Sequence, residues 1–379
     1  MKPVLVELTQ RNVFPGLELE GAGREEYIRR TLFPGKAIRA LQRRETARTL
    51  TKALDELQPS VLLLSGWSLP GAAEGLSWCA HRGVPAVLMS ESTKEDEPRK
   101  PWKEFVKRRV VRLFRAALVG GRKHRDYVTE LGMPANRVFT GYDAVDNGHF
   151  AAGADAVREE AAAWRLRLGL PEHYFLVCAR FEPKKNLSRL LEGFAAYRRL
   201  AGPQAWRLVL LGDGELRPVL ERARSQMGIQ EEVAMPGFLA YQELPAFYGL
   251  AGAFVHASTT EQWGLVVNEA MAAGLPVLVS NRCGCAPDLV EEGGNGFTFD
   301  PYDVDGLARL MFRMSALPGE QRQAMGRRSR EIIQHWGPER FAEGMRNAVE
   351  AALVAPRPRV GLLDKALLWA LIHRPGAVR

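Results

Sequence analysis

Two hydrophobic patterns alternate along most of this chain. Runs of four to six mainly apolar residues are separated by longer stretches in which apolar positions recur every three or four residues. The short runs are typical of buried strands and the longer stretches of amphipathic helices, so the alternation predicts parallel sheets covered by helices. We expect short buried strands at residues 4–8, 61–64, 85–89, 116–119, 174–179, 206–211, 253–256 and 276–279.

The alternation pauses near the middle of the chain. Residues 141–150 lead into an alanine-rich segment that contains glycine, and the strand pattern resumes at Tyr174. A chain of 379 residues suits two domains of similar size, and a cleft between domains is a usual place for a ligand. We therefore predict an α/β fold with two Rossmann-like, doubly wound domains, residues 1–152 and 153–338, that face a cleft. Residues 339–379 are expected to form helices that pack back on the first domain or face a membrane.

Two acidic residues stand eight positions apart in a segment that combines a loop, a helix and a strand. The pattern places Glu261 in the loop where a strand ends and Glu269 about two turns into the next helix. Both lie near the carboxyl edge, where open α/β sheets bind ligands. An ionised carboxylate accepts hydrogen bonds from paired hydroxyl groups of a ligand. For Glu269 alone, a solvated acid on an amphipathic helix is the competing interpretation.

The segment from Glu261 to Glu269, followed by EAMA-x-GLPV, resembles the donor-site signature of the retaining family 4 glycosyltransferases, the glycosyl transferases group 1. That family has the two-domain GT-B fold. The resemblance implies that Glu261 contacts hydroxyls of the donor sugar and that Glu269 accepts hydrogen bonds from the nucleotide ribose. It also implies that Arg180 and Lys185, which follow the strand at 174–179, hold the donor diphosphate. The catalytic candidates are therefore Glu261, Arg180 and Lys185.

Two cations at one strand-to-helix turn are well suited to a diphosphate. The guanidinium of Arg180 can take two phosphate oxygens while the ammonium of Lys185 neutralises further charge, so the leaving nucleotide needs no divalent cation. A basic surface turn is the alternative for either residue alone. Further nucleotide-binding candidates are glycines that permit close backbone approach, the free amides at a helix start, and a segment beside the base, namely Gly212, Gly264, Leu265, Val266, Gly237 and Phe238.

The match is weaker on the acceptor side. Many relatives carry a histidine after the strand that faces the reaction centre, whereas residues 87–92 contain none, so Ser90 or Glu91 would orient the sugar or the acceptor. A plain loop acid is the competing interpretation of Glu91. The start of the chain resembles a later strand of the family, with a polar loop after it. We therefore expect the first domain to lack its usual first strand, which leaves the activity of the chain as a question for experiment.

Composition restricts the partners and the compartment. Four scattered cysteines suit a reducing compartment, and Cys283 and Cys285 have no nearby histidine or cysteine to complete a metal site. There is no signal-peptide pattern and no apolar run that would span a bilayer. With a net charge of +8, we expect a cytoplasmic protein that also lies peripherally on the inner face of the membrane.

Two segments are candidates for that membrane contact. Residues 101–115 predict a basic amphipathic helix, with an apolar side made of Trp102, Phe105, Val106, Val110 and Leu113 and a basic side made of Lys103, Lys107 and Arg112. The basic side would rest on anionic lipid. A core helix with solvated cations is nearly as well supported. The tail at 362–373 is apolar on most sides and too short to span, so it is expected to lie in an interface or against the first domain.

The sequence thus predicts a metal-independent, retaining hexosyltransferase without a cofactor. It would move a hexose from a nucleoside diphosphate sugar to a hydroxyl of a glycan or a lipid-linked acceptor, in cell-surface or exopolysaccharide synthesis. A non-catalytic nucleotide-sugar-binding partner protein and a sugar epimerase on the same fold remain as alternatives. Nucleic acid is not an expected partner, because no aromatic platform or recognition motif accompanies the positive charge.

Overall fold

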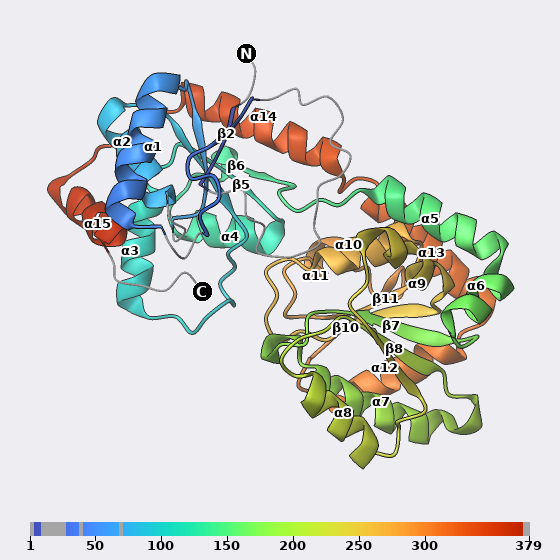
Figure 1. Cartoon of the computed structure of the whole chain (residues 1–379). Helices are drawn as coiled ribbons and strands as arrows, with labels where there is room; N and C mark the ends of the chain where they lie inside the picture. The colour runs from blue at the N-terminus through green and yellow to red at the C-terminus, as the bar shows by residue number, and fades with distance from the viewer. Residues whose placement is uncertain (1–3, 9–27, 38–40, 68–70, 374–379) are drawn as a thin grey trace.

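Two parallel sheets organise the part of the chain that the computed structural model describes, residues 4–8, 28–37, 41–67 and 71–373 (Figure 1). The first sheet has four strands in the order β3-β4-β5-β6. Its strands are β3 (Leu62–Ser65), β4 (Ala86–Ser90), β5 (Ala116–Val119) and β6 (Val138–Thr140). Its helices are α1 (Arg43–Leu57), α2 (Ala72–Arg82), α3 (Pro101–Val111) and α4 (Arg122–Glu130), together with α14 (Pro338–Val354) and α15 (Leu362–His373) from the end of the chain.

The second sheet has six parallel strands in the order β12-β11-β10-β7-β8-β9. The chain builds one half outward from β7 and then returns to build the other half from β10, so the direction of winding reverses between these two neighbours. Ligands of doubly wound sheets bind outside the carboxyl ends of the strands at such a reversal. The strands are β7 (Tyr174–Cys178), β8 (Arg207–Leu211), β9 (Val233–Gly237), β10 (Ala253–His256), β11 (Val277–Ser280) and β12 (Gly296–Phe299).

Alternate residues of these buried strands supply two separate apolar cores. Leu176 and Phe254 point to one face, and their neighbours Phe175 and Val255 point to the other. The first face is covered by α5 (Asn147–Glu159), α6 (Ala161–Leu168), α9 (Leu244–Leu250), α10 (Leu265–Ala272), α11 (Ala286–Leu289) and α13 (Gly319–Ile333). The second face is covered by α7 (Leu187–Ala201), α8 (Arg217–Gln226) and α12 (Val304–Ala316).

The last helices of the chain complete the first sheet. Val87 and Leu118 project from one face of that sheet against Ala348 and Ala352 of α14. The opposite face packs on α2 and α3, with Leu368 of α15 in the same core. The chain therefore crosses from the first unit to the second and back again.

The predicted α/β class with parallel sheets is confirmed, and the predicted strands match β1 (Val4–Glu7), β3, β4, β5, β7, β8, β10 and β11 within one or two residues. Four strands were not predicted, β2 (Ile28–Thr31), β6, β9 and β12. These are short or interrupted by polar residues, glycine or proline, so no apolar run marks them.

The prediction that residues 4–8 form a buried strand is wrong in one respect. β1 pairs only with β2, in a two-stranded parallel sheet apart from the other two, and Val4 and Leu5 are exposed. A pair of short strands has no second layer to cover both of its faces, so its apolar residues stay in contact with water. The polar loop expected after this strand falls within residues 9–27, outside the described residues.

The predicted helix at 101–115 differs from α3 in length and in polarity. α3 ends at Val111, and Trp102 and Phe105 are exposed instead of joining the core. The reason is that the inward surface near the start of α3 is occupied by charges. Lys107 forms ion pairs with Glu97 and Glu104 there, and Lys103 also pairs with Glu97.

Residue 152 lies within α5, a helix that packs against α9 and α10 of the second unit. Phe150 of α5 is fully buried in the second unit's core. The predicted boundary between residues 152 and 153 therefore falls inside a helix, while the boundary at 338 coincides with the first residue of α14.

Gly344 allows α14 to lie directly on the first sheet. A methyl group added there would be 2.7 Å from the carbonyl oxygen of Thr140 and 2.8 Å from Cδ1 of Leu118. We expect Gly344→Ala to lower the free energy of unfolding by about 1–3 kcal/mol relative to Gly319→Ala, measured by urea unfolding. Gly319 is the matched control because it also lies in a helix and a methyl group there meets nothing within 4 Å. Equal stabilities of the two variants would contradict close packing of α14.

Candidate functional site

Lys185 and Glu261 form an ion pair at the winding reversal of the second sheet. Lys185 ends a short 3-10 helix (Pro183–Lys185) that follows β7, and Glu261 lies in the loop after β10. Because β7 and β10 are parallel neighbours, the two loops leave the same edge of the sheet. Lys185 Nζ contacts Glu261 Oε2, and only 12% and 10% of the two side chains are exposed. The structure thus brings together two residues that are 76 positions apart.

Glu261 is held as an anion by three donors. His256 Nε2 and Ser258 Oγ each lie 3.2 Å from Glu261 Oε2, beside Lys185. Burial acts to raise the pKa of Glu261, but His256 and Lys185 outweigh it and hold the pKa well below its usual range. Burial lowers the pKa of His256 in turn, although Glu261 acts in the opposite direction. All three of these contacts, made by described residues, fall on Oε2, so Oε1 retains acceptor capacity for a ligand hydroxyl.

Glu269 has a different environment. It is the fifth residue of α10, in the second turn of the helix rather than two full turns into it, and it is half-buried. Tyr248 donates its phenolic hydrogen to Glu269 Oε2 at 2.7 Å. Burial raises the pKa of Glu269 to about 7 although the Tyr248 hydrogen bond lowers it. Near neutral pH this carboxyl group is therefore partly protonated.

The two cations predicted to bind the diphosphate, Arg180 and Lys185, have different environments. Lys185 is in the buried pair, whereas Arg180 is a mainly exposed side chain 3.3 Å from Glu182. Cys178 is the last residue of β7. Burial raises the pKa of the Cys178 thiol to about 12, with the charge of Glu269 adding to the rise and that of Lys185 opposing it. Lys185 and Glu261 thus meet at the ends of β7 and β10, Glu269 lies on the helix that follows the Glu261 loop, and Arg180 is mainly exposed.

The backbone positions predicted to bind the nucleotide lie at strand ends and at a helix start. Gly264 precedes α10 with φ +104°, a conformation that favours glycine, so the amides of Leu265 and Val266 open the helix. Gly212 lies between two strand ends, where a methyl group would stand 1.9 Å from the carbonyl oxygen of Ala179. Its amide donates to the carbonyl of Gly237 at 2.9 Å, and the neighbouring Phe238 is exposed.

Helix α4 of the first unit contacts the loops of the second unit that surround Glu261. Asp288 of α11 accepts a hydrogen bond from the backbone amide of Arg122 at 2.9 Å and pairs with its side chain at 3.1 Å. Lys123 donates to the carbonyl of Asn281 at 2.8 Å. Asp288 thus accepts a hydrogen bond from a free backbone amide at the start of a helix in the other unit.

His124 joins α4 to the residue next to Glu261. The amide of Gly121 donates to Nδ1 at 3.1 Å, so Nε2 carries the proton and donates to the carbonyl of Gln262 at 2.9 Å. Burial lowers the pKa of His124, which favours this neutral ring. Trp263, on the other side of Gln262, packs 5.8 Å from the His124 ring and donates its indole hydrogen to Asn268 at 2.9 Å. The first unit therefore positions the loop that carries Glu261.

The acceptor-side candidates differ in exposure. Ser90 is buried and accepts a hydrogen bond from the amide of Ser92 at 3.2 Å. Glu91 is exposed, and partial desolvation and the charge of Glu261 raise its pKa. Burial and Glu91 together raise the pKa of Asp143 to about 8.

The sequence analysis missed Tyr248, His256, Ser258, Asp143 and His124. Polar residues at or just after the end of an apolar strand, such as His256 and Ser258, carry a signal that could have been used. Tyr248 and His124 lie in ordinary helical patterns, and only the fold brings them to the site.

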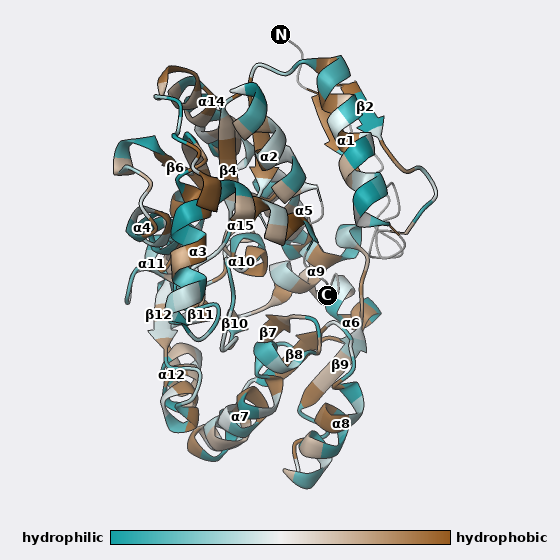
Figure 2. Cartoon of the chain, turned by 90° about the vertical axis from the view of Figure 1, so that its left-hand side faces the viewer, coloured by the Kyte–Doolittle hydropathy of each residue, from teal (hydrophilic) through white to brown (hydrophobic). Residues whose placement is uncertain are grey.

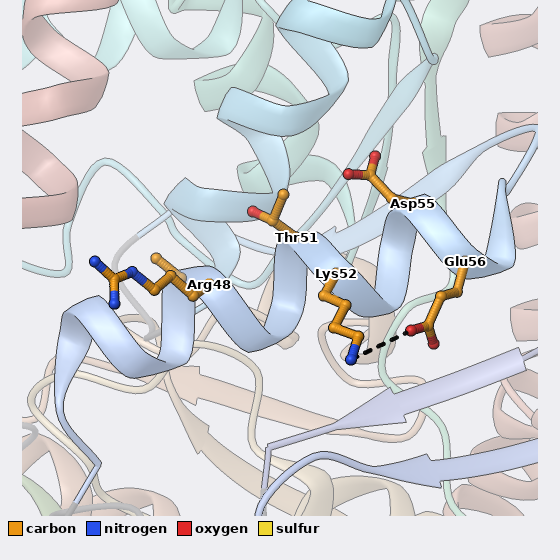
Figure 3. Close-up of a pocket in the computed structure, with 6 residues that line it drawn as sticks. Arg48, Thr51, Lys52, Asp55 and Glu56 are labelled. Carbon is orange, nitrogen blue, oxygen red and sulfur yellow. Dashed lines mark ion pairs between the residues drawn. The ribbon is translucent and has the colours of Figure 1, made fainter.

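Other features lie apart from this site. All four cysteines are free thiols, and no group of three or more potential metal ligands gathers in the described ranges. The hollow in Figure 3 is lined by residues of α1 alone, among them Arg48, Thr51 and Asp55. It contains none of the predicted site residues.

A family model for "Glycosyl transferases group 1" matches residues 159–332. Among similar curated proteins, a GDP-mannose-dependent alpha-(1-6)-phosphatidylinositol monomannoside mannosyltransferase of Mycolicibacterium smegmatis is 32% identical over 221 residues, 56% of this chain and 55% of that protein. An alpha-monoglucosyldiacylglycerol synthase of Acholeplasma laidlawii is 32% identical over 145 residues, 38% of this chain and 35% of its own length. The chain thus spans about half the length of the first of these relatives, and less of the second.

Solved structures show the same fold at low sequence identity. HepE of Anabaena in complex with UDP has a TM-score of 0.68 and 17% identity, covering 86% of this chain and 87% of that one. Sucrose-phosphate synthase of Thermosynechococcus elongatus also has a TM-score of 0.68, with 18% identity and coverage of 92% and 88%. The fold is therefore GT-B, as the resemblance implied. None of the helices in the described residues combines the length and apolar character that crossing a membrane requires.

The raised pKa of Glu269 predicts a stability difference that depends on pH. Its pKa is about 7 in the folded chain against a usual value of 4.5, so the folded state binds the extra proton between these values. Stability from this group is therefore present at low pH and falls as pH rises toward 7. We expect the Tm of Glu269→Gln relative to the unsubstituted protein to increase between about pH 5 and about pH 8. Glu215→Gln, an exposed acid, is the control, and a flat difference for Glu269→Gln would contradict the assignment.

Proposed function

We propose that this chain, whose residues 159–332 belong to the glycosyl transferases group 1 family, is a hexosyltransferase that uses a nucleoside diphosphate sugar. It would transfer the hexose to a hydroxyl of a glycan or a lipid-linked acceptor. The observation that carries the proposal is the buried Lys185–Glu261 pair at the carboxyl ends of β7 and β10, with Glu269 on the helix that follows the Glu261 loop. Such an arrangement suits a ligand with hydroxyls at one end and negative charge in the middle.

Each group has a separate role in this proposal. Glu261 accepts hydrogen bonds from sugar hydroxyls through its unoccupied oxygen, and Glu269 accepts them from the ribose. The diphosphate is bound by Lys185 and by the amides of Leu265 and Val266. The long, mainly exposed side chain of Arg180 adds a further contact. Gly212, Gly237 and Phe238 lie where the base would be bound.

We infer that the reaction retains the anomeric configuration and needs no divalent cation. Glu261 is a weak proton acceptor, because its charge is compensated by Lys185 and its pKa is depressed. The leaving diphosphate is then the better acceptor for the proton of the attacking hydroxyl, and both lie on one face of the sugar. Fixed cations stabilise the negative charge that develops on the leaving group. We expect transfer to persist in the presence of a metal chelator.

The names of similar proteins favour a lipid-linked acceptor for this chain. The names of two similar proteins describe a phosphatidylinositol monomannoside mannosyltransferase and a monoglucosyldiacylglycerol synthase. Glu91 and Asp143 of the first unit, whose raised pKa values reflect burial and neighbouring acids, would supply carboxyl groups for acceptor hydroxyls. A role in cell-surface or exopolysaccharide synthesis fits such acceptors.

A donor screen followed by a transfer assay tests the function. We expect one nucleoside diphosphate sugar to raise the Tm and to be consumed only with an acceptor present. Glu261→Gln should lower the transfer rate by about 100-fold or more while nucleotide affinity stays within about threefold, because this acid meets the sugar and not the nucleotide. Lys185→Gln should weaken both, and the exposed Glu350→Gln should change neither.

The same assay separates the alternatives. Binding of a nucleotide sugar without any transfer would favour a non-catalytic partner protein. Conversion of the donor into its epimer, without release of nucleoside diphosphate, would favour an epimerase. No binding of any nucleotide sugar would remove the proposal.

We further propose that the first unit contacts an anionic membrane surface through α3 and α15. These helices pack side by side (Figure 2), joined by the ion pair of Arg109 with Asp364 at 2.7 Å. Their exposed apolar side chains are Trp102, Phe105, Leu362, Leu363 and Trp369. Exposed cations flank them on α3 and just after it, Arg108 and Arg112. Aromatic side chains with basic neighbours suit the membrane interface better than Lys103 and Lys107, which are held in ion pairs.

Vesicle co-sedimentation tests this contact. We expect binding to vesicles that contain anionic lipid, and a loss of about tenfold or more in Trp102→Ala with Phe105→Ala. Phe312→Ala, an exposed aromatic residue of α12 in the second unit, is the control and should bind as the unsubstituted protein does. Equal binding by all variants, or no binding to anionic vesicles, would contradict the proposed surface.

A further inference from the structure

A second pocket lies at the opposite edge of the six-stranded sheet. Its floor includes His173, Gly252 and Pro276, which immediately precede β7, β10 and β11. Lys185 and Glu261 follow β7 and β10 at the other ends of the same strands. The pocket has a volume of about 460 Å³, and its walls come from α5, α6 and α13, which gather at this edge (Figure 1). It is therefore separate from the donor site.

The pocket is lined by far more positive than negative charge. Its five arginines are Arg158, Arg165, Arg322, Arg327 and Arg330. The acid in its lining is Glu172, which lies 3.8 Å from His173. Asp155, outside the lining, pairs with Arg158 at 2.9 Å and with Arg330 at 2.6 Å. Two carboxylates thus face five guanidinium groups.

Several of these guanidinium groups lack the partners that their burial calls for. The Nε atoms of Arg165 and Arg330 are buried without a hydrogen-bond partner among the described residues. Arg322 donates to the carbonyl of Leu317 and lies over the ring of Trp206, and no carboxylate of the described residues forms an ion pair with it. Burial lowers the pKa of Arg322, and burial together with the charge of Arg330 lowers the pKa of Arg158. Buried donors without partners and like charges in contact are both unfavourable unless a ligand compensates them.

From this cavity and its unmatched donors we propose that the pocket binds a small anion with two or more phosphate or carboxylate groups. A guanidinium group presents parallel donors that match the oxygens of such groups in pairs. Arginines on two sides of the pocket, on α5 and α6 and on α13, can hold two anionic groups at once. Gly319, the first residue of α13, also lines the pocket, so the positive end of this helix faces the same space.

Pyrophosphate is the probe for this site, with affinity measured by calorimetry on the full chain. The test variant is Arg165→Gln with Arg327→Gln, because neither residue has an ion pair in the described structure and their loss leaves the Asp155 pairs intact. The matched control is Arg222→Gln with Arg346→Gln, which removes the same charge from exposed positions on α8 and α14. Lys185→Gln weakens the donor site alone.

We expect the pocket variant to bind pyrophosphate about tenfold or more weakly, since each lost charge-assisted hydrogen bond has an effect of this order. The control variant should stay within about twofold of the unsubstituted protein. Lys185→Gln should lose only the pyrophosphate binding that belongs to the donor site and should keep the binding that the pocket variant loses. Pyrophosphate should also raise the Tm of the unsubstituted protein more than that of the pocket variant. Three results overturn the proposal: an equal loss in the control variant, a loss confined to Lys185→Gln, or no measurable binding to the unsubstituted protein.

Discussion

The candidate site depends on keeping one carboxylate charged in a place that water hardly reaches. Burying an ion is costly unless partners compensate it, and Glu261 is compensated by Lys185, His256 and Ser258 on a single oxygen. These partners come from three loops or strand ends, so the pair requires the winding reversal of the six-stranded sheet. It also requires the first unit, because His124 fixes the carbonyl of Gln262 next to Glu261. The charged state of Glu261 is thus a property of the whole fold.

The two acids of one sequence motif, Glu261 and Glu269, have pKa values that are shifted in opposite directions. Glu261 has three donors and a depressed pKa, whereas Glu269 has one neutral donor, Tyr248, and a pKa raised to about 7. Environments that separate pKa values in this way give similar side chains different tasks. The positive charge is divided as well. Part of it lies at the candidate site, part around α3, and five arginines gather at the far edge of the second sheet.

Much of the fold and part of the site could be predicted from the sequence, because both rest on local patterns. Buried parallel strands such as β5 and β8 are continuous apolar runs, and the spacing of Glu261 and Glu269 follows from one loop and one helix. β9 was missed because alanine, proline and glycine interrupt it, and α3 was misjudged because its inward surface meets charges from residues 97–104. His124 and Tyr248 act through partners 138 and 21 residues away. No local pattern reports such contacts, since only tertiary packing creates them.

The return of α14 to the first sheet has a consequence for how the protein is made. The second unit is a continuous stretch of chain, so a ribosome releases all of its strands and most of its helices before α14 emerges. The face of Val87 and Leu118 stays uncovered until then, and a nascent first unit carries an open apolar surface throughout most of synthesis. The second unit can therefore complete its core before the first unit does. Termination of translation upstream of Ala348 leaves the first unit without the helix that covers this face.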